Sequence, residues 1–444
     1  MRKLFGTDGV RGVAGELLSA ELALDLAQAA TRLTQAERPQ VLIVRDTRES
    51  GEMLQAAVAA GVAAAGGDAL LGGVLPTPAA PLLIARYGFD LAAVLSASHN
   101  PYQDNGIKFF GADGYKLSDE TELEIEHELE RAAGAEAGEG AGALRIGRIR
   151  ELRGAGEDYV RELHVRFAAL DLAGLDVLLD CANGATYEVA PEIFRRLGAN
   201  VTAVANAPDG RNINAECGST HVERLAEGVV AGGHALGFAF DGDGDRVLAV
   251  DGAGEVVDGD ELMALAALHL RGTERLSGNG VVVTAMTNYG FHTAMAEAGI
   301  EIASTQVGDR YVLAELLRRG WTLGGEQSGH LIELGFNRTG DGIAGALLTL
   351  EALAGADLRE RHAMAKLPQR LVNVRVRDRE ALHGSETVSA AVRVEEEGLA
   401  GRGRVLVRPS GTEPLVRVMV EAPTEAEAEE VCEKLVALVQ RELG

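Results

Sequence analysis

The stretch that decides the fold is Val41-Leu42-Ile43-Val44, followed by a polar turn at residues 46–51 with the sequence Asp-Thr-Arg-Glu-Ser-Gly. Four successive large apolar residues predict a buried strand of a parallel sheet. The alanine-rich segment after the turn predicts a helix, which ends near glycine and leads into a second strand at residues 67–70. This order of elements is the unit of an α/β fold.

The unit occurs three times in the chain. The other copies begin at Val177-Leu178-Leu179 and Val281-Val282-Val283, continue through the turns at 180–184 and 287–290, and reach second strands at 198–201 and 299–302. In each copy a third strand leads into a polar loop, which contains Ser98, Asp241 or Glu326. Ligand loops gather at the carboxyl ends of such strands, so the three loops are predicted to meet at one cleft.

The last quarter of the chain has a different pattern. Residues 371–377 and 415–420 alternate apolar and polar, as half-exposed antiparallel strands do, and Thr424 with Glu427 predicts the capped start of a final helix. We therefore predict an α/β protein of three similar α/β modules with mixed sheets, plus a smaller carboxyl-terminal α+β domain around a central cleft. The predicted domains are 1–153, 154–253, 254–366 and 367–444, and the glycine- and alanine-rich residues 132–143 are predicted to be a surface connection.

The first loop is Ser96-Ala97-Ser98-His99-Asn100-Pro101, which follows the predicted strand at residues 90–95. Its position makes Ser98 a candidate phosphoryl carrier or nucleophile. Lys108 can neutralise a transferred phosphate, or move a proton, because an ammonium desolvated near other cations loses its proton more easily. Taken alone, the sequence of this loop fits equally well a simple turn, in which Asn-Pro and Asn-Gly only interrupt regular structure.

The second loop places carboxylates at alternate positions, Asp241, Asp243 and Asp245, with glycines between them. Such a loop can converge on one hard cation. An EF-hand loop would need glycine at its sixth position and glutamate at its twelfth, where this chain has Arg246 and Gly252. A few carboxylates plus a phosphate oxygen is how magnesium is usually held, so one Mg²⁺ ion is favoured over an acidic hairpin turn.

The third loop, residues 324–330, carries Glu326 and Ser328 on a glycine-rich turn, which suits a ligand with many hydroxyls. Alone this is a weak signal, and His330 could equally be a satisfied, partly buried histidine.

The fourth loop, residues 408–414, combines Arg408 with Ser410, Gly411 and Thr412, and Arg417 lies on the next strand. Hydroxyls and amides around a glycine form an anion nest, and Arg408 adds a bidentate donor for phosphate. The alternative is a hairpin turn with an incidental arginine.

Composition excludes several classes of function. A net charge of -25 argues against a nucleic-acid surface, and no apolar run approaches the length of a membrane span. Three cysteines without metal-ligand spacing, and a start at Met1 without an apolar signal region, predict a reduced cytoplasmic protein. Lysine occurs only at positions 3, 108, 116, 366 and 434, whereas arginine is abundant.

The four loops, in this order and spacing, resemble the α-D-phosphohexomutase superfamily over essentially the whole chain, as does the amino-terminal segment 5–12, Phe-Gly-Thr-Asp-Gly-Val-Arg-Gly. The wording of residues 96–101, 325–330 and 308–311 is most similar to members that act on glucosamine phosphates. The resemblance implies an isomerase that interconverts glucosamine 6-phosphate and glucosamine 1-phosphate on the route to UDP-N-acetylglucosamine. It also implies a phosphoserine enzyme and a sugar 1,6-bisphosphate as intermediate and activator.

The resemblance also implies roles for individual residues. Ser98 would carry the phosphoryl group, and its oxygen would hold magnesium together with Asp241, Asp243 and Asp245. Lys108 and Arg11 would attend the transferring group, with His99 and His330 as further catalytic residues, whereas the general acid and base stay unassigned. The substrate would be bound by Glu326, Ser328, Asp309, Arg310, Arg408, Ser410, Gly411, Thr412 and Arg417.

Three other functions remain open. The nearest is a phosphomannomutase or phosphoglucomutase of the same superfamily. A serine hydrolase using Ser98 and His99 is disfavoured, because adjacent residues on one turn rarely meet in nucleophile–base geometry and no Gly-x-Ser-x-Gly elbow is present. A non-catalytic sugar-phosphate binding protein would leave the acidic loop without a purpose. The expected partner is a small hexosamine phosphate, and the oligomeric state stays open, with a homodimer among the candidates.

Overall fold

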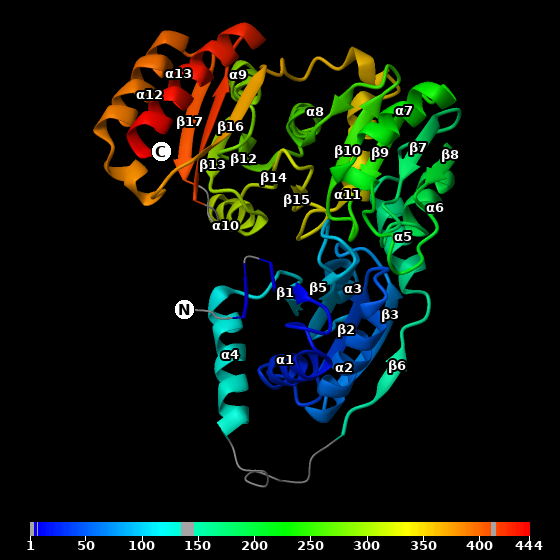
Figure 1. The fold of residues 1–444 in the computed structure, drawn as a ribbon. Helices are drawn as coiled ribbons and strands as arrows, with labels where there is room; N and C mark the ends of the chain where they lie inside the picture. Colours follow the sequence, from blue (N-terminus) through cyan, green and yellow to red (C-terminus); the bar gives the residue numbers. More distant parts are fainter. Residues whose placement is uncertain (1–3, 7, 135–145, 410–413) are drawn as a thin grey trace. The chain divides into compact units, whose positions relative to one another are not determined.

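The structure is a computed structural model that describes residues 4–6, 8–134, 146–409 and 414–444 (Figure 1). The chain divides into two compact units. The first unit consists of Met1–Ala285 with Ile302–Arg361, and the second of Met286–Glu301 with His362–Gly444. Within the described ranges, no helix is both long enough and apolar enough to cross a membrane.

The first sheet is built around the strand that opens the sequence argument. That strand, β2, pairs in parallel with β3 and β4, whereas β5 pairs antiparallel with β4 and β1, in the order β1-β5-β4-β2-β3-β6. The strands are β1 Val10–Val13, β2 Gln40–Arg45, β3 Asp68–Val74, β4 Leu91–Leu95, β5 Asp104–Gly111 and β6 Ile149–Glu151. The helices are α1 Ala20–Arg32, α2 Ser50–Ala64, α3 Ala79–Tyr87 and α4 Asp119–Gly134, of which α1 packs along α2. One apolar core contains residues of α1, α2 and this sheet.

Two further mixed sheets complete the first unit. One has the order β11-β10-β9-β7-β8 and the other the order β13-β12-β14-β15. Their strands are β7 Asp176–Asp180, β8 Asn200–Val204, β9 Leu236–Phe240, β10 Val247–Asp251, β11 Val256–Val257, β12 Gly280–Thr284, β13 Glu301–Thr305, β14 Leu323–Gly325 and β15 Leu331–Glu333. The helices around them are α5 Ala155–Arg166, α6 Val189–Arg196, α7 Glu223–Gly232, α8 Gly259–Gly272, α10 Asp309–Arg319 and α11 Gly342–Leu353. The predicted strands at 177–179 and 281–283 are thus confirmed as β7 and β12.

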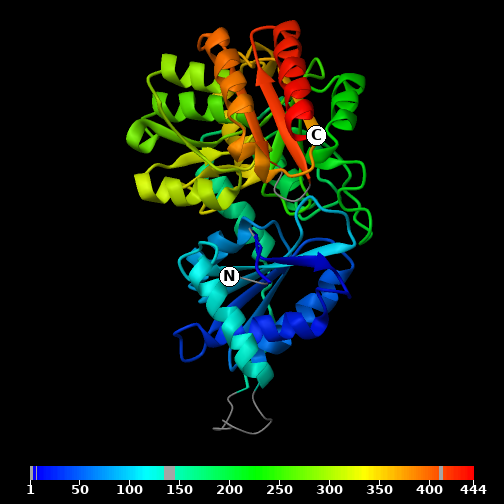
Figure 2. The ribbon, with the colours of Figure 1, turned by 60° about the vertical axis from the view of Figure 1, so that its left-hand side comes forward.

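The second unit is an antiparallel sheet with two helices on one face (Figures 1 and 2). Its order is β16-β18-β17, with β16 Gln369–Arg375, β17 Arg404–Pro409 and β18 Leu415–Glu421, and the covering helices are α12 Glu386–Leu399 and α13 Glu425–Leu443. The predicted cap is present, since Thr424 accepts a hydrogen bond from the amide of Glu427. The α+β character of the last quarter is confirmed.

The helix α9 Tyr289–Glu297 also belongs to the second unit. Its first amide donates to the fully buried Glu421 at 2.8 Å, and the amide of Leu367 donates to the capping side chain of Asn288 at 3.0 Å. The four predicted domain boundaries themselves stay predictions. Most of the predicted surface connection at 132–143 lies outside the described residues.

A buried carboxyl caps the central helix α11. Asp341 Oδ1 accepts hydrogen bonds from the amide of Ala344 and the hydroxyl of Tyr159, both at 2.9 Å, and Oδ2 accepts one from Asn337 Nδ2 at 3.1 Å. Burial raises the pKa of Asp341 to about 6, even though these hydrogen bonds act to lower it. The charged carboxylate is therefore disfavoured in the fold.

We predict that Asp341→Asn makes stability less sensitive to pH. The folded pKa of about 6 exceeds the roughly 3.9 of an unfolded aspartate, so the contribution of Asp341 to folding is full below pH 4 and is lost as the pH rises through 6. Asparagine stays neutral. Between pH 4.5 and 7.5 the unfolding free energy of the variant should therefore rise relative to the wild type, by up to about 3 kcal/mol, and its Tm should rise with it. Asp357→Asn, at an exposed cap, should show a constant Tm difference. A constant difference for Asp341→Asn as well would contradict the prediction.

Candidate active site

Three loops of the first unit line one cavity of about 410 Å³. The predicted loops around Ser98, Asp241 and Glu326 all contribute to its wall, together with the segment before β1 and the segment before α10. The lining residues are Asp8, Arg11, Ser98, His99, Asp245, Arg246, Val307, Gly308, Asp309, Glu326, Ser328 and His330.

Ser98 lies just after β4 with its hydroxyl aimed at the acidic loop. Its Oγ donates to Asp241 Oδ2 at 2.6 Å and lies 3.3 Å from His99 Nδ1. The expectation that the neighbouring Ser98 and His99 do not meet in nucleophile–base geometry stays a prediction, although the two side chains are in contact beside the left-handed backbone of Ser98 (φ 56°). The single proton of the hydroxyl is given to Asp241, so His99 Nδ1 must be the donor in the other contact.

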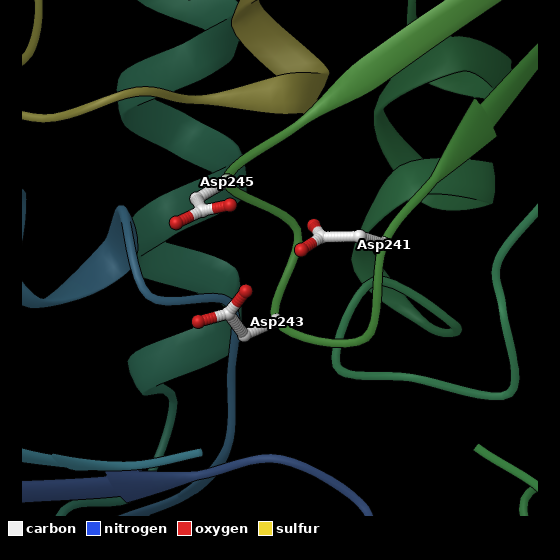
Figure 3. A group of neighbouring side chains, drawn as sticks. All are labelled: Asp241, Asp243 and Asp245. Atoms are coloured by element: carbon white, nitrogen blue, oxygen red, sulfur yellow. The ribbon is translucent and has the colours of Figure 1, made fainter. Parts of the chain in front are cut away.

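The three carboxylates of the acidic loop point into a shared space (Figure 3). Asp241, Asp243 and Asp245 are buried, and each offers an oxygen that lies within 4.8 Å of the others. The Oδ1 atoms of Asp243 and Asp245 are buried and have no hydrogen-bond partner among the described residues. Burial and the two neighbouring charges raise the pKa of Asp241 well above its usual range. Buried carboxylate oxygens that lack hydrogen bonds and repel one another are the donor set of a hard divalent cation, so these residues fit a metal ion.

Lys108 on β5 lies between two carboxylates. Its Nζ is 2.8 Å from Asp243 Oδ2 and 2.9 Å from Asp8 Oδ2. Burial opposes the charge of Lys108, but the two aspartates outweigh it and raise the pKa of the ammonium. Of the two roles that the sequence allowed, the structure favours a fixed positive charge over proton transfer.

Asp8 reaches Lys108 because β1 runs very close to β5. A Cβ on Gly9 (φ 75°) would lie 2.4 Å from the carbonyl oxygen of Ile107, so only glycine permits this approach. Asp8 also pairs with Arg11 and, through Oδ1, with Lys116 at 2.6 Å. Although burial raises the pKa of Asp8, Lys108, Lys116 and Arg11 together lower it well below its usual range.

Lys116 extends this network to the third loop. Its Nζ lies 2.5 Å from Asp309 Oδ2, which is 3.9 Å from His330 Nε2. His330 Nδ1 lies 3.6 Å from Asp245 Oδ2. Lysines and aspartates thus alternate from the acidic loop through Lys108, Asp8, Lys116 and Asp309, and His330 leads back to the acidic loop.

The protonation of His330 is set by opposing effects. Burial lowers its pKa, but Asp245 and Asp309 outweigh burial and raise it. The amide of Gly340 donates to Nε2 at 3.2 Å, so in this structure Nε2 is an acceptor and the proton lies on Nδ1, toward Asp245. By contrast, burial, Arg246 and Arg11 lower the pKa of His99 to about 4, which keeps that ring neutral.

The remaining predicted residues of the first unit differ in position. Glu326 and Ser328 line the cavity, and Glu326 Oε1 is fixed by the amide of Gly308 at 3.0 Å. Arg310 instead pairs with Asp119 and Glu122 on α4, and it lines a neighbouring cavity of about 220 Å³ rather than this one.

Arg408 and Arg417 lie in the second unit, directly opposite each other on β17 and β18. Arg408 Nη2 contacts Met286 Sδ at 3.3 Å, and Arg417 Nε is buried without a hydrogen-bond partner among the described residues. Burial and the charge of Arg417 lower the pKa of Arg408, which is the environment of an anion site. Ser410, Gly411 and Thr412 lie outside the described residues.

Sequence reasoning left three residues of the site without a role: Asp8, Lys116 and Arg246. Arg246 lines the cavity and directly follows the acidic loop, and its buried Nε lies 3.8 Å from Asp245 Oδ1 without a hydrogen bond among the described residues. Lys116 is one of only five lysines, two of which meet at Asp8. Arg246 and Asp8 could have been assigned to the site from their positions beside sequence motifs. For Lys116, the available signal was the scarcity of lysine in this chain.

Four family models match the chain in order. They describe phosphoglucomutase/phosphomannomutase alpha/beta/alpha domain I over residues 2–135, domain II over 157–254, domain III over 258–371 and the C-terminal domain over 371–438. Among curated relatives, the phosphoglucosamine mutase of Desulforudis audaxviator is 52% identical, covering 99% of this chain and 98% of the relative. The phosphoglucosamine mutase of Moorella thermoacetica is 51% identical, covering 97% of this chain and 98% of the relative.

Solved structures share the fold at low sequence identity. A phosphoglucomutase/phosphomannomutase family protein of Burkholderia thailandensis superimposes with a TM-score of 0.81 at 22% identity, covering 100% of this chain and 99% of the other. The N-acetylphosphoglucosamine mutase of Aspergillus fumigatus, solved in complex with GlcNAc-6P and magnesium, has a TM-score of 0.67 at 18% identity, covering 99% and 96%.

We predict that Asp243→Asn weakens binding of divalent metal ions by at least about tenfold, because it removes one of the three charges that attract the ion. Calorimetric titration with a divalent chloride measures this directly. Asp176→Asn, a half-exposed aspartate at the start of β7, should leave the affinity unchanged. Circular dichroism should show both variants folded, and equal affinity in Asp243→Asn and the wild type would refute the metal site.

Proposed function

Because this chain belongs to the phosphoglucosamine mutase family, we propose that it interconverts glucosamine 6-phosphate and glucosamine 1-phosphate as an isomerase. The observation that carries the proposal is the hydrogen bond from Ser98 to Asp241, which joins a nucleophile to the buried acidic loop at the wall of one cavity. The product would enter synthesis of UDP-N-acetylglucosamine. Three buried cysteines without a disulfide support a cytoplasmic enzyme.

We assign the phosphoryl carrier to Ser98. A free hydroxyl of the sugar phosphate attacks the phosphorus of phosphoserine, the bond between phosphorus and Oγ breaks, and the proton of the attacking hydroxyl leaves to a base. The sugar 1,6-bisphosphate then turns over and returns its other phosphoryl group to Ser98. This transfer needs in-line placement and charge stabilisation more than further covalent chemistry.

The charges around Ser98 suit that task. A divalent cation held by Asp241, Asp243 and Asp245, which we propose is Mg²⁺, would neutralise phosphoryl oxygens when bound. Lys108 is held protonated by Asp243 and Asp8, so it provides a fixed positive charge beside the proposed metal ligand Asp243. Arg11 lines the same cavity as Ser98. Because those charges are fixed by ion pairs before the substrate arrives, they need little reorganisation during transfer.

Another part of the cavity wall suits a sugar ring. Glu326 can accept hydrogen bonds from ring hydroxyls, Ser328 can accept or donate them, and the amide of Gly308 holds the glutamate in place. Asp309 lies on the same wall, where its negative charge can meet the ammonium group of a hexosamine. Arg310 supports this wall indirectly, through its ion pairs to α4.

For the phosphate that does not react, we propose a clamp in the second unit. Arg408 and Arg417 face each other across two strands, and two adjacent cations favour a doubly charged anion between them. Ser410, Gly411 and Thr412 would complete this clamp.

The proposed reaction predicts turnover of glucosamine 6-phosphate with Mg²⁺ and a trace of sugar bisphosphate, faster than turnover of glucose or mannose phosphates. Ser98→Ala should lose at least about 10⁴-fold in kcat, as when a nucleophile is removed, while Ser389→Ala on exposed α12 should keep full activity. Peptide mass spectrometry should find the phosphate on Ser98. Equal or greater turnover of glucose or mannose phosphates would move the assignment to a phosphoglucomutase or phosphomannomutase. Binding without turnover would indicate a non-catalytic protein.

The clamp predicts a different signature. Arg408→Lys replaces a bidentate fork by a point charge, so it should raise KM about tenfold and release more bisphosphate during its turn. Phosphorylation of Ser98 by added bisphosphate should continue. Arg402→Lys, whose parent residue pairs with Glu427 in the same unit, should behave as the wild type. Loss of Ser98 phosphorylation with normal bisphosphate retention in Arg408→Lys would assign the loop to the chemistry instead.

A further inference from the structure

We propose that Asn214 is a positioning residue that holds the Ser98 loop in its reactive conformation, together with the buried Arg48. The inference rests on the proposed function, because it takes Ser98 as the phosphoryl carrier. Asn214 belongs to the segment between β8 and α7, far along the chain from Ser98, and it does not line the cavity.

Two backbone carbonyls of the Ser98 loop share the same two donors. The oxygen of Ser98 accepts from Asn214 Nδ2 at 2.9 Å and from Arg48 Nη2 at 3.1 Å. The oxygen of Asn100 accepts from Asn214 Nδ2 at 3.0 Å and from Arg48 Nη2 at 2.6 Å. The loop is therefore held by two side chains, Arg48 from the turn after β2 in its own module and Asn214 from the neighbouring α/β module.

This grip matters because the loop is strained. Ser98 has φ 56°, a left-handed conformation that is unfavourable for a residue with a side chain. A buried chain of hydrogen bonds fixes the start of the loop, from the amide of Ser98 to Ser96 Oγ and from Ser96 to Asp46. Arg48 is fully buried and pairs with the same Asp46. Of the two side chains that donate to these loop carbonyls, Arg48 comes from the first α/β module and Asn214 from the second, predicted at residues 154–253.

The acidic loop packs onto the same place. A Cβ on Gly242 would lie 2.5 Å from the carbonyl oxygen of Ser98 and 2.7 Å from Asn214 Nδ2. Asn214 thus lies at the junction of the Ser98 loop and the Asp241 loop, whose side chains meet at 2.6 Å. Removing its amide would leave both carbonyls with one donor fewer and free the loop to relax. The distance between Ser98 Oγ and the acidic loop would then no longer be fixed.

The backbone of Asn214 allows its side chain to be tested separately. Asn214 is itself left-handed (φ 57°), and its amide donates to the carbonyl of Ala182 at 2.9 Å. Asn214→Gly keeps that conformation at no steric cost and removes only the side-chain donor. Asn214→Asp keeps the shape but turns an acceptor toward two carbonyls. The matched control is Glu216→Gly, also left-handed (φ 52°), two residues away, with an exposed pair to Arg224.

The experiment measures steady-state kinetics of the Mg²⁺-loaded full-length variants and single-turnover phosphorylation of Ser98 by glucosamine 1,6-bisphosphate. We expect Asn214→Gly to lower kcat about 10- to 100-fold, with KM changed less than about twofold, because the reacting atom is misplaced while the cavity wall is intact. The kcat of Asn214→Asp should be lower than that of Asn214→Gly, and the kcat of Glu216→Gly should match that of the wild type. Hydrogen exchange in peptides spanning residues 96–101 should speed up in the two Asn214 variants alone.

Wild-type kcat in Asn214→Gly, full activity in Asn214→Asp, or a loss expressed only in KM would overturn the positioning role. A lower Tm with unchanged kcat per folded molecule would also overturn it, since that pattern describes packing alone. Failure of the proposed function has a separate signature, because the wild type itself would then not be phosphorylated on Ser98.

Discussion

Burying three carboxylates within a few ångströms of one another is the constraint on which the rest of the site depends. Asp241, Asp243 and Asp245 repel in a low-dielectric interior, and each needs a cation, a proton or a donor. Lys108 and the hydroxyl of Ser98 meet this need from the first module, and His330 meets it from the third. The acidic loop thereby draws side chains from three separate sheets toward one point.

The same electrostatics continue outward as an alternation of sign. Lys108 pairs with Asp8 as its second partner, Asp8 also pairs with Lys116, and Lys116 pairs with Asp309. Each buried charge is stabilised by the next, whereas a single buried ion pair often costs as much in desolvation as it returns. A chain of this kind fixes every member before a ligand enters, which is the condition for electrostatic catalysis without reorganisation. Within a chain of net charge -25, the cations of the site are committed to named partners.

The sequence predicted the features that depend on local pattern. Strands such as Val41–Val44, the cap at Thr424 and the three loops at strand ends follow from periodicity and turn chemistry, so they were readable without the fold. The contact of Ser98 Oγ with His99 Nδ1 was not predicted, and residue identity did not signal the left-handed φ of Ser98. Lys116, Arg310 and Asn214 act over 100 to 200 residues of chain, and only the packing of one module on another assigns their partners.

The left-handed backbone at Ser98 also bears on whether threonine could replace serine as the proposed phosphoryl carrier. Threonine offers the same kind of hydroxyl group. At φ 56°, however, a β-branched side chain crowds its own backbone, so threonine at this position would lose the conformation that turns the oxygen toward Asp241. The choice between two nearly equivalent alcohols is thus made by a torsion angle and not by reactivity.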